Sequence, residues 1–208
     1  MSPTLHSAKQ GRQPRRLIAY IAVFGSLWGL AEASLGTTLH LLKIPFSGLI
    51  LTAIALNIIL IARAFYDAPG STISIALLAA VIKALSLSTI KVGPIVGILM
   101  EGLLAEAILT LIGPGRTGFL IAGLSLGIYP LVQSIITRTI LFGAAFVPMI
   151  LELVEGLSNR VGSGFGWILL ITYVILHVVI GLAAAGIAWT IRRHTAAKLT
   201  AMPLNEHH

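Results

Sequence analysis

The stretch Ile95–Gly113 reads IVGILMEGLLAEAILTLIG, and it carries two glutamates, Glu101 and Glu106, inside an otherwise apolar segment of membrane-spanning length. A carboxylate at that depth costs roughly 2.5–3.5 kcal/mol on insertion scales, so it usually faces a bundle interior or a wet cavity. We therefore expect other parts of the chain to supply polar partners. The candidates lie in four other apolar stretches: Glu32, Lys83, Arg138 and His177.

The composition is that of an integral membrane protein. Of the 208 residues, 57% are hydrophobic and 10% are charged, whereas charged residues make up about 25% of a soluble domain. This length accommodates about six spans of ~20 residues with short connections. The chain is therefore expected to form a single membrane domain.

Cysteine content and charge narrow the function classes. The chain has no cysteine, which excludes disulfides, thiolate metal sites and cysteine nucleophiles. The net charge of +7 comes mostly from basic residues beside apolar spans, a pattern that reflects membrane topology rather than binding of a polyanion. The expected surroundings are a lipid bilayer, and no nucleic-acid partner is predicted.

The predicted fold is all-α, with six transmembrane helices and both termini in the cytoplasm. Residues 1–16 are interpreted as a disordered basic cytoplasmic tail and residues 194–208 as a second cytoplasmic tail, whose final Glu206-His207-His208 resembles a trimmed purification tag. Between them lies one domain, 17–193. Its spans are expected at about 17–42, 46–64, 71–90, 95–113, 117–146 and 167–191, with a kink in the fifth near Pro130.

One long connection, 147–166, is expected outside the cytoplasm. Its first half has apolar residues at helical spacing, as in an amphipathic helix at the membrane interface. Its second half, VGSGFG, is expected to act as a hinge. A lid over a binding site is one interpretation, and a plain amphipathic connector is the other.

Basic residues set the predicted orientation, because cytoplasmic loops carry an excess of Lys and Arg. Nine of them fall on the side of the termini and three on the other side, which predicts an inner (plasma) membrane protein with cytoplasmic ends. The nine are Lys9, Arg12, Arg15, Arg16, Arg63, Arg116, Arg192, Arg193 and Lys198, and the three are Lys43, Lys91 and Arg160.

Most polar groups within the spans are predicted to share one layer. With a rise of ~1.5 Å per residue, five of them fall between the mid-plane and the outer surface. They are Glu32, Lys83, Glu101, Arg138 and His177. We expect them to line a ligand cavity together with Gln133, with His40 near its mouth. Structural ion pairing and a proton relay or catalysis are the alternatives, and Glu106, about 7 Å deeper, is expected in a different contact.

The first predicted helix carries a ridge of small residues. Ala22 and Ser26 are four residues apart, as are Gly25, Gly29 and Ala33. Small residues at this spacing let another helix approach closely. The ridge is interpreted either as a docking face for a partner or as a packing face within the same chain.

In size, six predicted spans, cytoplasmic termini, this ridge and the layer of polar groups, the chain resembles the substrate-binding S components of energy-coupling factor (ECF) transporters. In that family an Ala-xxx-Ala type motif of the first helix docks on a transmembrane coupling subunit. The resemblance implies high-affinity binding of a vitamin-like organic solute for uptake, with coupling and ATPase subunits as partners and no catalytic role or cofactor. The nickel and cobalt branch begins Met-His and uses that terminus as metal ligand, whereas this chain begins Met1-Ser2, which favours an organic ligand.

Two other functions remain open from the residues alone. Glu32, Glu101, His177 and His40 supply oxygen and nitrogen groups for an intramembrane metal-binding protein or enzyme, although no HExxH pair occurs. A small proton-coupled carrier is the third hypothesis. We see no inverted repeat between residues 17–113 and 117–191 that would support it.

Overall fold

The computed structural model describes the backbone of residues 4–43, 46–86, 92–162 and 164–201, and the side chains in these ranges apart from those at 4–14, 40, 196 and 198–201. These residues form seven helices and no strand, which confirms the all-α prediction. The helices are α1 (Thr4–Leu41), α2 (Ser47–Phe65), α3 (Ser71–Leu85), α4 (Val92–Leu111), α5 (Arg116–Phe142), α6 (Phe146–Val161) and α7 (Phe165–Ala201).

Five helices of the described chain are long and apolar enough to cross a membrane, as expected of a multi-pass membrane protein. They are α1, α2, α4, α5 and α7. The third predicted span is shorter than expected: α3 has 15 residues, or about 22 Å at a rise of ~1.5 Å per residue, against a hydrocarbon core of about 30 Å. It ends at Leu85 because Ser86 adopts an extended backbone, and residues 87–90 of that predicted span lie outside the described residues.

Helix ends differ from the prediction in the polar regions. The basic segment 1–16 was expected to be disordered, yet α1 already begins at Thr4, and α7 continues to Ala201 beyond the expected end of the sixth span. Hydropathy marks only the part of a helix that suits hydrocarbon, so it misses polar turns that continue the same helix. The fifth span ends at Phe142 rather than at 146, because Gly143 has a positive φ of 81°.

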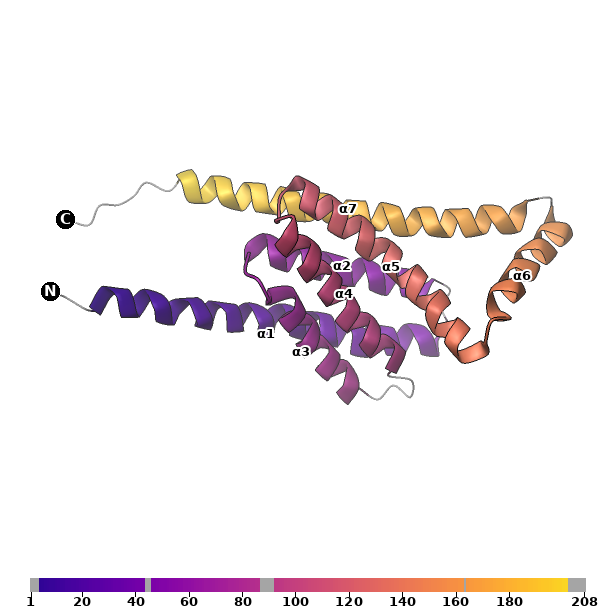
Figure 1. Ribbon diagram of the computed structural model, residues 1–208, viewed down its shortest axis with the longest axis horizontal. Helices are drawn as coiled ribbons and strands as arrows, with labels where there is room; N and C mark the ends of the chain where they lie inside the picture. Colours follow the sequence, from indigo (N-terminus) through magenta and orange to yellow (C-terminus); the bar gives the residue numbers. More distant parts are fainter. Residues whose placement is uncertain (1–3, 44–45, 87–91, 163, 202–208) are drawn as a thin grey trace.

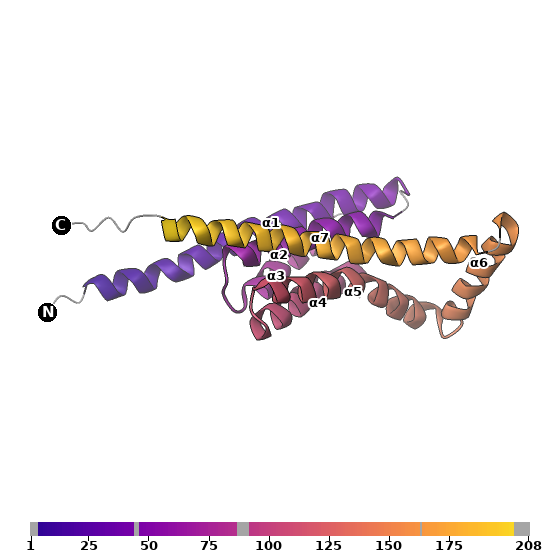
Figure 2. The same cartoon turned by 90° about the horizontal axis from the view of Figure 1, so that it is seen from above.

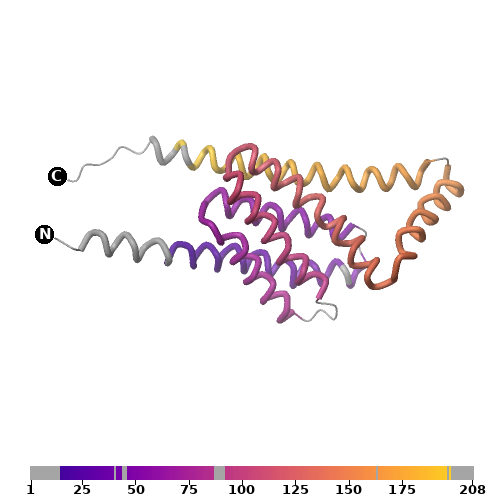
Figure 3. Tube along the Cα trace, viewed as in Figure 1, coloured from indigo at the N-terminus to yellow at the C-terminus, as the bar shows by residue number. Residues whose placement is uncertain are grey.

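Six of the helices form a closed ring in which each packs on its two neighbours, in the order α1, α3, α4, α5, α7, α2. From α1 to α5, each helix runs opposite to the one before it in the chain, as the trace in Figure 3 shows, so the ring neighbours α1 and α3 run in the same direction. Helix α2 also contacts α3, α4 and α5, so it lies closest to the centre. Both views place the start of α1 and the end of α7 at the same end of the molecule, with α6 at the opposite end (Figures 1 and 2).

Helix α6 occupies the long connection in which the sequence predicted an amphipathic helix. It packs on α5 and α7. After it, Gly162 and Gly164 have positive φ values of 152° and 86°, which side chains with a Cβ rarely adopt. These two glycines allow the chain to reverse from α6 into α7.

The core and the outer surface are both apolar. Trp28, Leu56, Ile59 and Phe119 are fully buried, while α5 and α7 expose many large aliphatic side chains. Among them are Ile135, Ile136, Ile140, Ile171, Ile175 and Val179. Soluble monomers rarely expose apolar surface on this scale, and lipid is the solvent that suits it.

Part of the small-residue ridge of α1 packs inside the chain. A Cβ placed on Gly25 would lie 2.9 Å from Cβ of Leu78, and one on Gly29 would lie 2.7 Å from Cβ of Ile82, so both glycines are in close contact with α3. The prediction of a partner-docking face is therefore corrected for Gly25 and Gly29, because α3 already covers them. Of the other ridge residues, Ala22 is exposed, and Ser26 and Ala33 are partly exposed.

Candidate functional site

A pocket of about 330 Å³ lies between α1, α2, α3, α4 and α5. Five of the seven predicted site residues line it: Glu32, Lys83, Glu101, Gln133 and Arg138. The remaining lining residues are Leu51, Gly93, Pro94, Gly97, Ile98, Pro130, Ser134 and Thr137. The pocket uses the far part of α1, the starts of α2 and α4, and the ends of α3 and α5, so it lies toward the end of the bundle away from the termini.

Two of the charged residues pair with each other across α1 and α3. Nζ of Lys83 lies 3.7 Å from Oε2 of Glu32 and donates a hydrogen bond of 2.5 Å to the backbone carbonyl of Glu32. Gly36, one turn further along α1, allows this approach: a Cβ there would lie 3.1 Å from Nζ of Lys83. Lys83 is 4% exposed, so the ammonium group is held by its partner rather than by water.

Glu101 differs from this pair. Its side chain is buried, at 8% exposure, and among the residues that the structure describes it has no hydrogen bond or ion pair. The expectation that Lys83, Arg138 or His177 would pair with it is not met. A buried carboxyl without a partner is costly, and this one opens into a pocket, where a ligand or water can supply hydrogen bonds.

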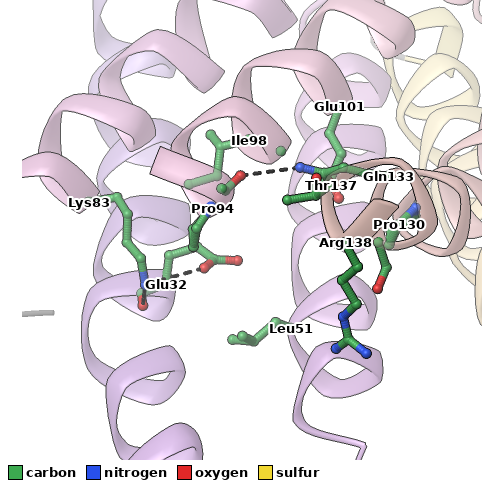
Figure 4. A pocket seen from close by; sticks show the side chains of 13 residues that line it. Glu32, Leu51, Lys83, Pro94, Ile98, Glu101, Pro130, Gln133, Thr137 and Arg138 are labelled. Atoms are coloured by element: carbon green, nitrogen blue, oxygen red, sulfur yellow. Dashed lines mark hydrogen bonds and ion pairs between the residues drawn. The ribbon is translucent and has the colours of Figure 1, made fainter. Parts of the chain in front are cut away.

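Helix α5 provides the polar wall opposite α1. Nε2 of Gln133 donates a hydrogen bond of 3.2 Å to the carbonyl of Gly93. The same amide lies against Gly97, where an added Cβ would be 3.0 Å from both polar atoms of Gln133. Figure 4 shows Glu101 pointing from α4 toward Gln133 and Thr137. Gly97 on α4 thus gives the amide the room it needs.

Arg138 extends from α5 on a different side of the pocket from Glu101 (Figure 4). Its side chain is exposed, and its guanidinium carbon lies 5.9 Å from the ring centroid of Phe146. Within the described residues no carboxylate lies within ion-pair distance of it. Arg138 is therefore a cation at the pocket wall that lies over an aromatic ring.

Of the two predicted histidines, His177 has a described side chain, and it does not join this group. His177 is fully buried on α7, where its Nδ1 lies 3.0 Å from the carbonyl of Tyr173 and its ring packs edge-on against the Tyr173 ring at 4.6 Å. It does not line the pocket, so its predicted place in the cavity is not observed. His40 lies in α1, but its side chain is outside the described residues.

A second polar cluster surrounds Glu106 at the other end of α4. Its Oε1 accepts hydrogen bonds from the Gly70 amide at 2.7 Å and Thr110 Oγ1 at 2.7 Å, and lies 3.4 Å from Nη1 of Arg63. Its Oε2 accepts from the amide of Thr72, at 3.0 Å, and from the Thr72 hydroxyl. Because Gly70 and Thr72 begin α3, Glu106 caps that helix with a favourable negative charge. As predicted, Glu106 takes part in a contact separate from the pocket that holds Glu101.

Sequence reasoning missed the buried contacts of Arg63, which it used only as one of the cations on the side of the termini. Arg63 is 1% exposed and contacts Asp67, Ser71, Glu106 and Thr110. It also missed Ser134 and Thr137, which line the pocket. Their spacing from Pro130, at four and seven residues, places all three on one helix face and is the signal that identifies them.

No family model, curated protein or solved structure matches the chain. The geometry also offers no metal centre: in the described part of the chain no three His, Cys, Asp or Glu residues are grouped closely enough to hold an ion. Among the described residues, the site provides a small polar pocket with apolar walls, the Glu32–Lys83 ion pair, the Glu101 carboxyl without a described partner, and the Arg138 guanidinium. Such a site is suited to binding a small polar organic molecule.

Proposed function

We propose that this protein is the membrane-embedded solute-binding subunit of an uptake system for a small organic micronutrient, of the kind that the S components of ECF transporters represent. In this proposal the chain crosses the plasma membrane six times with cytoplasmic termini. The pocket then opens in the outer half, where it receives solute from outside the cell.

The observation that carries this proposal is Glu101, which has no partner among the described residues, in a pocket with four other predicted polar residues. Satisfied ion pairs stabilise a bundle without needing a pocket, whereas a buried carboxyl that faces a cavity without a partner destabilises the empty protein. Its presence is explained when a bound solute supplies the missing hydrogen bonds. The position of α6 at the same end of the bundle fits a role in covering or uncovering the pocket.

The partners in this proposal are a transmembrane coupling subunit and ATPase subunits. The exposed side of the α1 ridge, with Ala22 and parts of Ser26 and Ala33, is the docking face, because α3 covers Gly25 and Gly29. An Ala22→Leu substitution is expected to reduce co-purification of ATP-hydrolysing subunits while leaving solute binding unchanged. Ala183→Leu, at an exposed position of α7, is the matched control, and an equal loss with both variants contradicts this docking face.

The first experiment is thermal unfolding of the purified protein across a panel of water-soluble vitamins and divalent metals. A ligand at 100 times its Kd adds about 2.7 kcal/mol of stability, which shifts the melting temperature measurably. We expect one organic compound to stabilise the wild type and to lose that effect in Glu101→Gln. Glu152→Gln, at an exposed position of α6, is the matched control. Stabilisation by a metal alone favours the metal-binding hypothesis instead.

A further inference from the structure

The pairing inside the pocket leaves an unequal set of charges available to a ligand. Four charged side chains line the pocket, two acidic and two basic. Glu32 and Lys83 already contact each other at 3.7 Å, so they form part of the wall. Glu101 and Arg138 have no such contact with each other or with another charged group of the described chain.

These two remaining charges lie on different sides of the pocket. Figure 4 shows Glu101 on α4 pointing toward Gln133 and Thr137, whereas the guanidinium of Arg138 extends from α5 toward the side where Leu51 lies. A solute that satisfies both groups therefore needs a cationic end and an anionic end that are separated. A single small ion neutralises one of them and leaves the other without a counter-charge.

Apolar side chains also line the pocket. Leu51, Pro94, Ile98 and Pro130 come from three different helices. This surface suits an apolar or aromatic body between two charged ends. Gln133 adds an amide beside Glu101, with one hydrogen bond already used for the carbonyl of Gly93.

We propose that the solute is amphoteric: its cationic group binds Glu101, its anionic group binds Arg138, and its apolar body lies against Leu51 and Ile98. This inference rests on the proposed function and names the chemical class of its ligand. A charged pair is strongest when it is shielded from water. Glu101, the more buried of the two residues, therefore contributes more to affinity than Arg138.

Matched probes with one ring system test the assignment. Tryptophan carries both charges, tryptamine only the cation, indole-3-propionate only the anion, and tryptophol neither; the vitamin panel is sorted into the same four classes. Thermal shift and equilibrium dialysis of the full chain are measured for the wild type, Glu101→Gln, Arg138→Gln and the control Glu152→Gln. Small molecules that co-purify with the wild type are released and identified by mass spectrometry.

We expect the tightest ligand of the wild type to be amphoteric and to bind at least about tenfold more tightly than its singly charged analogues. Glu101→Gln is expected to weaken amphoteric and cationic compounds about tenfold or more and to spare anionic ones, and Arg138→Gln is expected to do the reverse.

A tightest ligand that is neutral or singly charged overturns this inference while leaving the proposed function intact. An equal loss of affinity for cationic and anionic compounds in Glu101→Gln or in Arg138→Gln also overturns it. A wild type that no compound of any class stabilises, and from which no small molecule is released, contradicts the proposed function and this inference together.

Discussion

Helix α4 carries two glutamates five residues apart, and their surroundings are opposite. Glu106 accepts hydrogen bonds from Gly70, Thr72 and Thr110 and pairs with Arg63, so each of its oxygens is used. Glu101 is buried in a pocket wall and has no such contact within the described residues. The same residue type thus holds helices together at one end of α4 and stays available at the other.

The surroundings of the two glutamates distinguish a charge that stabilises the fold from one that is available for binding. A saturated buried cluster is explained by the fold alone, because each group's desolvation is offset by its partners. An unsaturated buried charge raises the free energy of the folded protein, so binding is the simplest reason for its presence. Substitutions in the two clusters should accordingly change different measurable quantities.

The largest effect is expected from Glu106→Ala. It removes the acceptor for the first amides of α3 and one of the two carboxylates that the buried Arg63 contacts, and breaking a buried pair in this way costs about 3–5 kcal/mol. Unfolding in mixed micelles with increasing SDS measures the loss. Glu101→Ala, the same substitution on the same helix, is the control, and an equal loss of stability in both variants contradicts the distinction.

A smaller loss, about 1–3 kcal/mol, is expected from Lys83→Met, which leaves the Glu32 carboxylate without its Lys83 partner. Adding Glu32→Gln removes that charge as well, so the double variant should recover about 1 kcal/mol or more. The same unfolding titration measures both, with the exposed Arg193→Met as control. A double variant that is no more stable than Lys83→Met contradicts a structural role for this pair.

Much of the site follows from the sequence for one physical reason. A charged residue within an apolar span must face protein or water rather than lipid, so Glu32, Lys83, Glu101 and Arg138 identify the inward faces of four helices. The structure places all four, with Gln133, around one pocket.

Pairing within the site is not predictable from the sequence. Which of Glu32 and Glu101 pairs with Lys83 depends on distances of a few ångströms between α1, α3 and α4, and residue spacing contains no such information. His177 shows the same limit, because a buried histidine is satisfied equally well by its own helix, here through the carbonyl of Tyr173.

The fold shows the same limit: hydropathy predicts which segments are helices, whereas the helix ends and the pairing of helices depend on packing. All-α structure and most helix positions come from hydropathy, but the short α3 and the long polar ends of α1 and α7 do not. Arg63 was misplaced because a cation at the end of an apolar span resembles a loop cation until its acidic partner is known. Gly25 and Gly29 would let any helix approach α1 closely, so only the structure shows that the helix is α3.

An ion pair lies at the edge of the Glu106 cluster. Nη2 of Arg192 on α7 lies 3.1 Å from Oδ2 of Asp67, and the two side chains are 31% and 38% exposed. Partly exposed pairs of this kind contribute about 0.2–1 kcal/mol. Arg192→Gln should therefore lower stability slightly, and less so at high salt. Arg193→Gln is the neighbouring control, and a loss as large as that of Glu106→Ala is inconsistent with an edge contact.

The smallest change in stability is expected from Glu101→Gln, although it lies deep in the bundle. Because no described residue pairs with the Glu101 carboxyl, removing its charge leaves no orphaned partner, and the free energy of unfolding should change by less than about 0.5 kcal/mol or rise. The added stability that a bound solute provides should disappear in the same variant. A substantial loss of stability in the absence of solute instead assigns Glu101 a structural partner, and its carboxyl then belongs to the same class as that of Glu106.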